Sequence, residues 1–103
     1  MAQIKFELDP AKMANPDLDI RYRLPDQLAA LPESTMTDNG YDYSDDEPPM
    51  LVVFVRSEMP DADVKRAIRF LAANTLLENS ILDAATISIS DDDRNWTQRY
   101  PYS

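Results

Sequence analysis

Hydrophobic and polar residues alternate strictly near the start of the chain. Over residues 3–8, Ile4, Phe6 and Leu8 occupy every second position and polar residues lie between them. A period of two predicts a strand that buries one face. Residues 17–24 repeat this alternation, and the intervening Asp-Pro and Asn-Pro pairs are turn formers. The pattern therefore predicts that the two segments pair as an antiparallel hairpin.

A helix signal and a loop signal follow this predicted hairpin. Pro25 at a first-turn position predicts a helix over residues 25–31, which Pro32 limits to one or two turns. Residues 33–49 show no apolar periodicity and contain Asn-Gly and Pro-Pro pairs, which indicates a loop. Loops of this length are uncommon in compact domains unless they serve a function.

The second half of the chain alternates between strand and helix patterns. Residues 50–55 are apolar and rich in β-branched side chains, which is typical of a strand covered on both faces. A proline followed by two acids predicts the start of a helix over residues 60–79. Alternation over residues 84–90 predicts another strand, and a shorter pattern over residues 96–100 predicts an edge strand.

Together these elements predict a single α+β domain of 103 residues. A strand-helix-strand unit forms a right-handed crossover, so the strands over 50–55 and 84–90 are expected to be parallel, though not necessarily adjacent. We expect a mixed sheet of four or five strands with one main helix on one face. Phe70 and Leu77 lie at the margin of that helix's apolar stripe, where core packing is favoured over contact with a partner.

Composition restricts the chemistry that the chain can perform. It contains no cysteine and no histidine, which removes thiol nucleophiles, the usual zinc ligands and the commonest general base near neutral pH. An enzyme is therefore disfavoured, and we expect no cofactor and no metal site. With 19 acidic and 10 basic residues, the net charge of -9 repels nucleic acid and anionic lipid and attracts basic proteins.

The amino-terminal residues lack the pattern of a secretory signal, and no apolar run reaches membrane-spanning length. We therefore expect a cytoplasmic protein that does not enter a membrane.

The densest chemical feature is the segment 38–47, which holds five acids and two tyrosines without any basic residue. Carboxylates there would pair with Lys or Arg of a partner, and tyrosines supply the rigid contact area that is common in interfaces. The alternative is a solvated loop without a binding role. We interpret the segment as a partner-binding surface formed by Asp38, Tyr41, Asp42, Tyr43, Asp45, Asp46 and Glu47.

Other acids have simpler explanations than catalysis or metal binding. Asp42, Ser44 and Asp46 share the initial spacing of a calcium-binding loop, but that loop's glycine at position six and glutamate at position twelve are missing. Three acid pairs flank a predicted strand, a helix start and a turn, where acids are usually structural. These pairs are Asp17/Asp19, Asp61/Asp63 and Asp91/Asp93.

The last ten residues contain the only tryptophan. Large aromatic side chains often fix a final strand on the core, and we expect this role for Trp96. The roles of Tyr100 and Tyr102 stay open, because tyrosines are also frequent in interfaces.

The acidic segment, the overall charge, the small size and the lack of catalytic residues resemble the immunity proteins that bacteria encode beside secreted toxins. This resemblance rests on residues 38–47 and the net charge. It implies a tight one-to-one complex with a basic toxin domain, often a nuclease, whose cationic cleft the acids would cover. The acids would steer the partner, and Tyr41 and Tyr43 would fill pockets on it.

Three other functions stay open, and the first would use the same acids in a different arrangement. A nucleic-acid mimic that blocks a host defence enzyme would need its acids in a long row along the surface. A small metal-dependent hydrolase would need a concave cluster that includes Asp17 and Asp19. An assembly or chaperone subunit would self-associate through Phe70 and Leu77, and the pattern does not define the oligomeric state.

Overall fold

Five strands form one sheet in the order β2-β3-β1-β4-β5, and every neighbouring pair is antiparallel. The computed structural model describes residues 2–15, 19–45, 47, 49–77, 79–92 and 94–101. Its elements are β1 (Ala2–Leu8), the 3-10 helix η1 (Pro10–Lys12), α1 (Ile20–Ala29), β2 (Thr37–Tyr43), β3 (Leu51–Ser57), α2 (Pro60–Ala73), α3 (Ile81–Ala84), β4 (Ala85–Ser90) and β5 (Thr97–Tyr100). The predicted α+β class is confirmed.

Two strand-helix-strand units each pass over one strand of the sheet. The β3-α2-β4 unit places β1 between its two strands, so β3 and β4 are parallel without being adjacent, as predicted. The β1-α1-β2 unit places β3 between its strands in the same way. Because each gap is filled by an antiparallel strand, the mixed sheet that we expected is replaced by an antiparallel one. This is the connectivity of ferredoxin-like folds, extended by β5 at the β4 edge.

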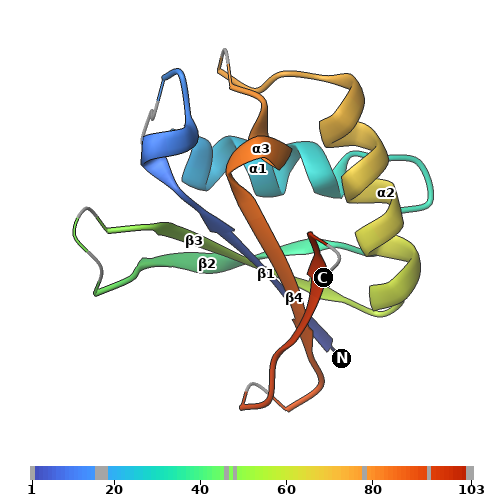
Figure 1. Cartoon of the computed structure of the whole chain (residues 1–103). Coiled ribbons are helices and arrows are strands. Elements are labelled where there is room, and N and C mark those ends of the chain that lie inside the picture. Colours follow the sequence, from blue (N-terminus) through green and yellow to red (C-terminus); the bar gives the residue numbers. More distant parts are fainter. Residues whose placement is uncertain are drawn as a thin grey trace.

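The core lies between one face of this sheet and the helices, which Figure 1 shows on the same side of it. Phe6 in the central strand lies opposite Val53 of β3 and Ile87 of β4, and all three are fully buried. The helix α1 contributes buried residues at four-residue intervals, and α2 contributes a second buried stripe. The predicted strands over residues 3–8 and 84–90 are confirmed, because their alternating apolar residues all face this core.

The predicted strand over residues 17–24, and with it the hairpin, is wrong. Residues 20–29 form α1, and residues 17 and 18 lie outside the described part of the chain. Ile20, Leu24 and Leu28 are fully buried at the i, i+4, i+8 spacing of a helix, whereas Tyr22 is half-exposed. The same segment satisfies both periods, and Pro25 lies within the helix instead of at its start.

The predicted loop over residues 33–49 is also wrong in part, because residues 37–43 form β2. This strand is exposed along almost its whole length, so it carries no alternating apolar pattern. Backbone pairing with β3, on the register Tyr41 to Val53 and Tyr43 to Leu51, holds it in place. Its partner β3 is an interior strand as predicted, although it runs over residues 51–57.

The main helix ends earlier than residue 79, at Ala73. Asn74 takes an extended conformation, and its side-chain amide donates to the Phe70 carbonyl at 2.9 Å. The chain then turns around the fully buried Asn79, which is hydrogen-bonded to Asn15 and Leu77. Both Phe70 and Leu77 pack against the core, as favoured by the sequence.

The final strand over residues 97–100 is confirmed, but Trp96 does not belong to the core cluster. It is half-buried on the sheet face that points away from the helices, where its ring lies 6.1 Å from that of Phe54. The Lys5 ammonium stands 4.4 Å above the same ring. Tyr100 packs against the core, and Tyr102 lies outside the described residues.

Candidate protein interface

The strand β2 forms one edge of the sheet and is the element that carries most of the predicted site residues. A register irregularity between Asp38 and Tyr41 interrupts its pairing with β3. Gly40 lies within this bulge at a φ of 91°, a conformation that side chains disfavour, and nothing lies within 4 Å of where a Cβ would stand. Its N–H donates to Asp38 Oδ1 at 2.9 Å, so the predicted Asn-Gly turn signal marks a bulge within a strand.

Three tyrosines gather where β2 meets α1. The Tyr41 and Tyr43 rings lie 6.0 Å apart, and the Tyr22 ring of α1 lies 6.1 Å from Tyr41, both pairs in edge-to-face contact. Their positions follow from the register, since Tyr41 and Tyr43 are paired with core residues of β3 and therefore point to the helix-covered side. We call Tyr22, Tyr41, Tyr43 and Arg21 the tyrosine cluster.

Arg21 holds the tyrosine cluster together. Its guanidinium lies 4.7 Å from the Tyr22 ring and 5.1 Å from the Tyr41 ring, and its Nη1 donates to the Tyr43 hydroxyl at 3.4 Å. Interactions with the hydroxyl groups of Tyr22 and Tyr43 raise the pKa of Arg21, so it stays charged. Its Nε is buried without a hydrogen-bond partner among the described residues. The arginine therefore contacts all three tyrosines of the cluster.

The cluster leaves a large aromatic surface in contact with solvent. Tyr22 is 50% exposed, Tyr41 42% and Tyr43 39%. Among the described residues, the only other large hydrophobic side chain with comparable exposure is Met59, at the start of α2. Tyrosine and arginine are the residue types enriched at the energetic centres of protein interfaces. Arrangement and composition thus fit a protein-binding surface.

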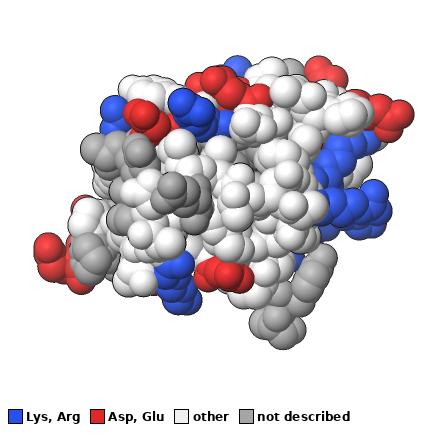
Figure 2. All heavy atoms as spheres, turned by 90° about the horizontal axis from the view of Figure 1, so that it is seen from above, with Lys and Arg blue, Asp and Glu red and all other residues white. Residues whose placement is uncertain are grey.

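The predicted acids lie along β2 and in the connection that follows it, without forming one compact group. Asp38 and Asp42 lie on β2, whereas Asp45 and Glu47 lie in the connection to β3, and all four are exposed. Asp46 lies outside the described residues. Figure 2 shows the charges on the helix-bearing side, with acidic side chains at the left end, where Figure 1 places the β2–β3 connection, and others along the remaining margins. Basic side chains lie on the right, where Figure 1 places α2, and others lie among the acids elsewhere.

None of these four acids is neutralised by an ion pair within the described part of the chain. The pairs found there join Lys5 to Glu7, Arg66 to Glu33 and Asp63, and Arg99 to Asp61. The two acids of β2 instead accept backbone hydrogen bonds, Asp38 from the Gly40 N–H and Asp42 from the Tyr43 N–H at 2.8 Å. The negative charge at this edge therefore remains available to an external cation.

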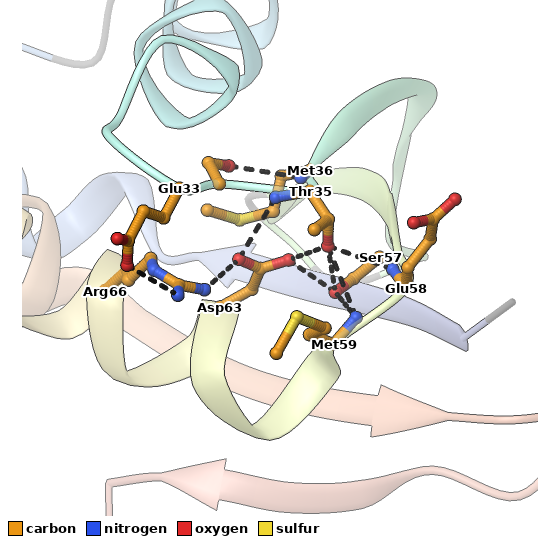
Figure 3. A network of polar contacts seen from close by, with 9 residues as sticks. Glu33, Thr35, Met36, Ser57, Glu58, Met59, Asp63 and Arg66 are labelled. Carbon is orange, nitrogen blue, oxygen red and sulfur yellow. Dashed lines mark hydrogen bonds and ion pairs between the residues drawn. The ribbon is translucent and has the colours of Figure 1, made fainter.

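Asp63, one of the acids considered structural, is the centre of a buried polar junction (Figure 3). Its Oδ2 accepts from the hydroxyls of Thr35 at 2.5 Å and Ser57 at 2.6 Å. Its Oδ1 accepts from the Thr35 N–H at 3.3 Å and from Arg66 Nη1 at 2.8 Å. Burial raises the pKa of Asp63, but the hydrogen bonds from Ser57 and Thr35 outweigh it, so the net shift is downward. The junction ties the start of α2 to the segment before β2.

Two further acids also hold parts of the fold together. Asp92 Oδ1 accepts from the N–H groups of Asn95 and Arg94, which lowers the pKa of Asp92 and closes the turn between β4 and β5. Asp61 pairs with Arg99 across α2 and β5. Asp17 and Asp93 lie outside the described residues. Within the described ranges, no group of three or more His, Cys, Asp or Glu residues is placed to hold a metal ion.

The structure brings together Tyr41 and Tyr43, as the sequence predicted, and adds two residues that the sequence did not identify. Arg21 and Tyr22 were missed because residues 17–24 were assigned to a strand. The available signal was the spacing of Ile20, Leu24 and Leu28, which places Arg21 and Tyr22 on the margin of a helix beside the next element.

Comparisons with protein-family models, curated proteins and solved structures gave no match for the chain. Of the helices described here, none is both long enough and apolar enough to cross a membrane.

Proposed function

We propose that this chain is an inhibitory binding protein of the immunity type, which neutralises a basic toxin domain through the tyrosine cluster and the acids beside it. The observation that carries the proposal is the tyrosine cluster itself. Three half-exposed rings are held in place by one arginine, on a protein whose other large apolar side chains are mostly buried. Fixed aromatic side chains lose little conformational entropy when a partner covers them.

Charge supports a basic partner. The chain carries a net charge of -9, and Asp38, Asp42, Asp45 and Glu47 have no ion-pair partner among the described residues. In such an interface the exposed acids at the margin raise the association rate, and the buried aromatic centre slows dissociation. A nuclease domain, with a cationic substrate cleft, is the toxin class that fits these acids best.

The first experiment identifies the partner and locates its contact on this chain. Tagged full-length protein is used to capture binding proteins from the native host, with the Tyr41→Ser/Tyr43→Ser variant and the Met59→Ser variant as parallel baits. Met59 is 51% exposed and lies outside the tyrosine cluster, so its substitution is a matched control. We expect one basic protein to be captured by the wild type and by Met59→Ser, but not by the tyrosine variant.

The second experiment tests neutralisation. The captured protein is expressed in a sensitive strain with or without this chain, and growth is measured. Restored growth that depends on Tyr41 and Tyr43 supports the proposal. A captured protein that is acidic, or that does not harm the cell, contradicts it.

Charge-reversal variants separate the effect of the acids on the association rate from the effect of direct contact with the partner. Asp45→Lys/Glu47→Lys should slow association with the captured protein and weaken its salt dependence. Asp83→Lys/Asp91→Lys reverses the same charge at two exposed acids outside the site and serves as the control. Equal effects of the two variants would show that only net charge matters.

A further inference from the structure

The outer edge of β2 is not paired with any other described strand. The sheet order begins with β2, whose only neighbour is β3. The Ser44 N–H donates to the Met50 carbonyl at 3.0 Å, so Ser44 and Met50 form a hydrogen-bonded pair of the antiparallel ladder. Because paired and unpaired positions alternate in antiparallel ladders, the backbone groups of Tyr41 and Tyr43 point away from β3. An open strand edge therefore runs directly beside the tyrosine cluster.

The two sides of this edge differ in chemistry. Tyr41 and Tyr43 point to the helix-covered side, where they meet Tyr22. Asp42 lies opposite Val52, on the other side of the sheet. A strand placed alongside β2 would alternate in the same way, so its residues on one side would contact tyrosine rings and those on the other would face Asp42.

Carboxylates of the chain itself occupy N–H groups at this edge. Asp42 accepts from the Tyr43 N–H and Asp38 from the Gly40 N–H. Charged residues on an edge strand disfavour pairing with a second copy, which would bring the acids of two β2 strands together. A segment that carries lysine or arginine removes this repulsion, and it draws the Asp42 carboxylate into an ion pair.

We propose that an extended basic segment of the protein partner adds to β2 as a sixth strand of the sheet. Apolar or aromatic residues of this segment would lie on the tyrosine cluster, and alternate lysine or arginine residues would face Asp42. This inference rests on the proposed function, because it specifies how the same surface takes its partner. Main-chain hydrogen bonds at Tyr41 and Tyr43 would supply affinity, and the alternation would supply specificity.

The test uses a synthetic ten-residue peptide in which lysine alternates with valine or threonine, and the full-length protein labelled for NMR. Two further peptides carry N-methyl groups on every second residue. One is methylated at the odd-numbered positions and the other at the even-numbered positions, so that each peptide has one hydrogen-bonding edge blocked. Only one peptide edge can face β2. We expect one N-methylated peptide to bind at least tenfold more weakly than the parent and the other to bind within about twofold. The parent should also slow amide exchange at Tyr41 and Tyr43.

Different outcomes separate failure of this inference from failure of the proposed function. Equal binding of all three peptides, abolished by Tyr41→Ser/Tyr43→Ser, would overturn strand addition but leave the tyrosine cluster as the binding surface. Binding that is unaffected by that variant would contradict both. Absence of peptide binding at millimolar concentration would overturn the inference. A dimer in solution that protects the Tyr41 and Tyr43 amides would show that a second copy occupies this edge instead.

Discussion

The junction around Asp63 and the outer edge of β2 contain similar side chains in opposite situations. Both combine carboxylates, hydroxyl groups and an arginine. Asp63 is fully buried, and both of its oxygens accept hydrogen bonds from the chain itself. The tyrosines beside β2 keep much of their surface exposed, and the nearby acids have no ion-pair partner among the described residues.

This difference separates residues that stabilise the fold from residues whose surface a partner can cover. Removing a buried acceptor leaves its donors unpaired inside the protein, which destabilises the folded state. Removing a half-exposed ring loses only the area that folding had buried. Stability and binding should therefore respond to different substitutions.

The largest effect on stability is expected for Asp63→Ala. Thr35, Ser57 and Arg66 would lose their shared acceptor, and the free energy of unfolding should fall by about 3 kcal/mol. Urea unfolding, followed by the fluorescence of Trp96, measures this change. Asp61→Ala on the same helix is the control, because its side chain is 71% exposed and should cost about 1 kcal/mol or less. Equal losses in the two variants would contradict the assigned role of the junction.

The fold was predictable where side-chain burial follows the backbone period. Strands β1 and β4 alternate because one face of each meets the core, so their pattern is visible in the sequence. Strand β2 is held by backbone pairing and exposes its side chains, so it leaves no such pattern. Residues 20–24 fit both periods, and the helix is distinguished by the continuation of the buried four-residue spacing to Leu28.

The candidate site was predictable only in its local part. Tyr41, Tyr43 and the neighbouring acids are close in sequence, so their association was evident from composition. Arg21 and Tyr22 come from another element and join them only after α1 packs beside β2. The Asp63 junction was hidden for the same reason, since its donors Thr35 and Ser57 lie on separate segments.

Lowering the pH is expected to reduce the free energy of unfolding by less than the substitution Asp63→Ala does. The pKa of Asp63 is lower in the folded protein than the ordinary value of 3.8, so its ionised form stabilises the fold above that pH. This contribution is lost as the pH falls through the folded-state pKa. Asp63→Asn should therefore lose less stability than the wild type between pH 6 and pH 2, measured by urea unfolding at each pH. Equal losses of stability in the two proteins between pH 6 and pH 2 would contradict the assignment of this acid sensitivity to Asp63.

Part of the acid sensitivity should persist in Asp63→Asn. The pKa of Asp92 is also lowered, by the N–H groups of Asn95 and Arg94, and its contribution has the same sign. The double variant Asp63→Asn/Asp92→Asn should show the weakest dependence on acid, which tests whether the two contributions are independent.

Arg21→Met tests how the tyrosine cluster is held. The variant keeps an unbranched side chain in α1 but removes the cation that lies over Tyr22 and Tyr41 and donates to Tyr43. We expect the ring-proton shifts of the three tyrosines to move toward values of mobile side chains, with less loss of stability than in Asp63→Ala. Arg23→Met, at an exposed position of the same helix, is the control. Unchanged ring shifts in Arg21→Met would show that the rings are held without the arginine.

A small effect on stability should accompany the largest effect on binding. Tyr41→Ser/Tyr43→Ser removes rings that are 42% and 39% exposed, so the free energy of unfolding should change by about 1 kcal/mol or less per ring. Affinity for the captured partner should fall at least tenfold, because the rings form the centre of the proposed interface. Asp63→Ala should show the reverse, with affinity preserved under conditions where the variant is folded. If the tyrosine variant unfolded as readily as Asp63→Ala, the rings would belong to the support of the fold, and β2 would have no surface set apart for a partner.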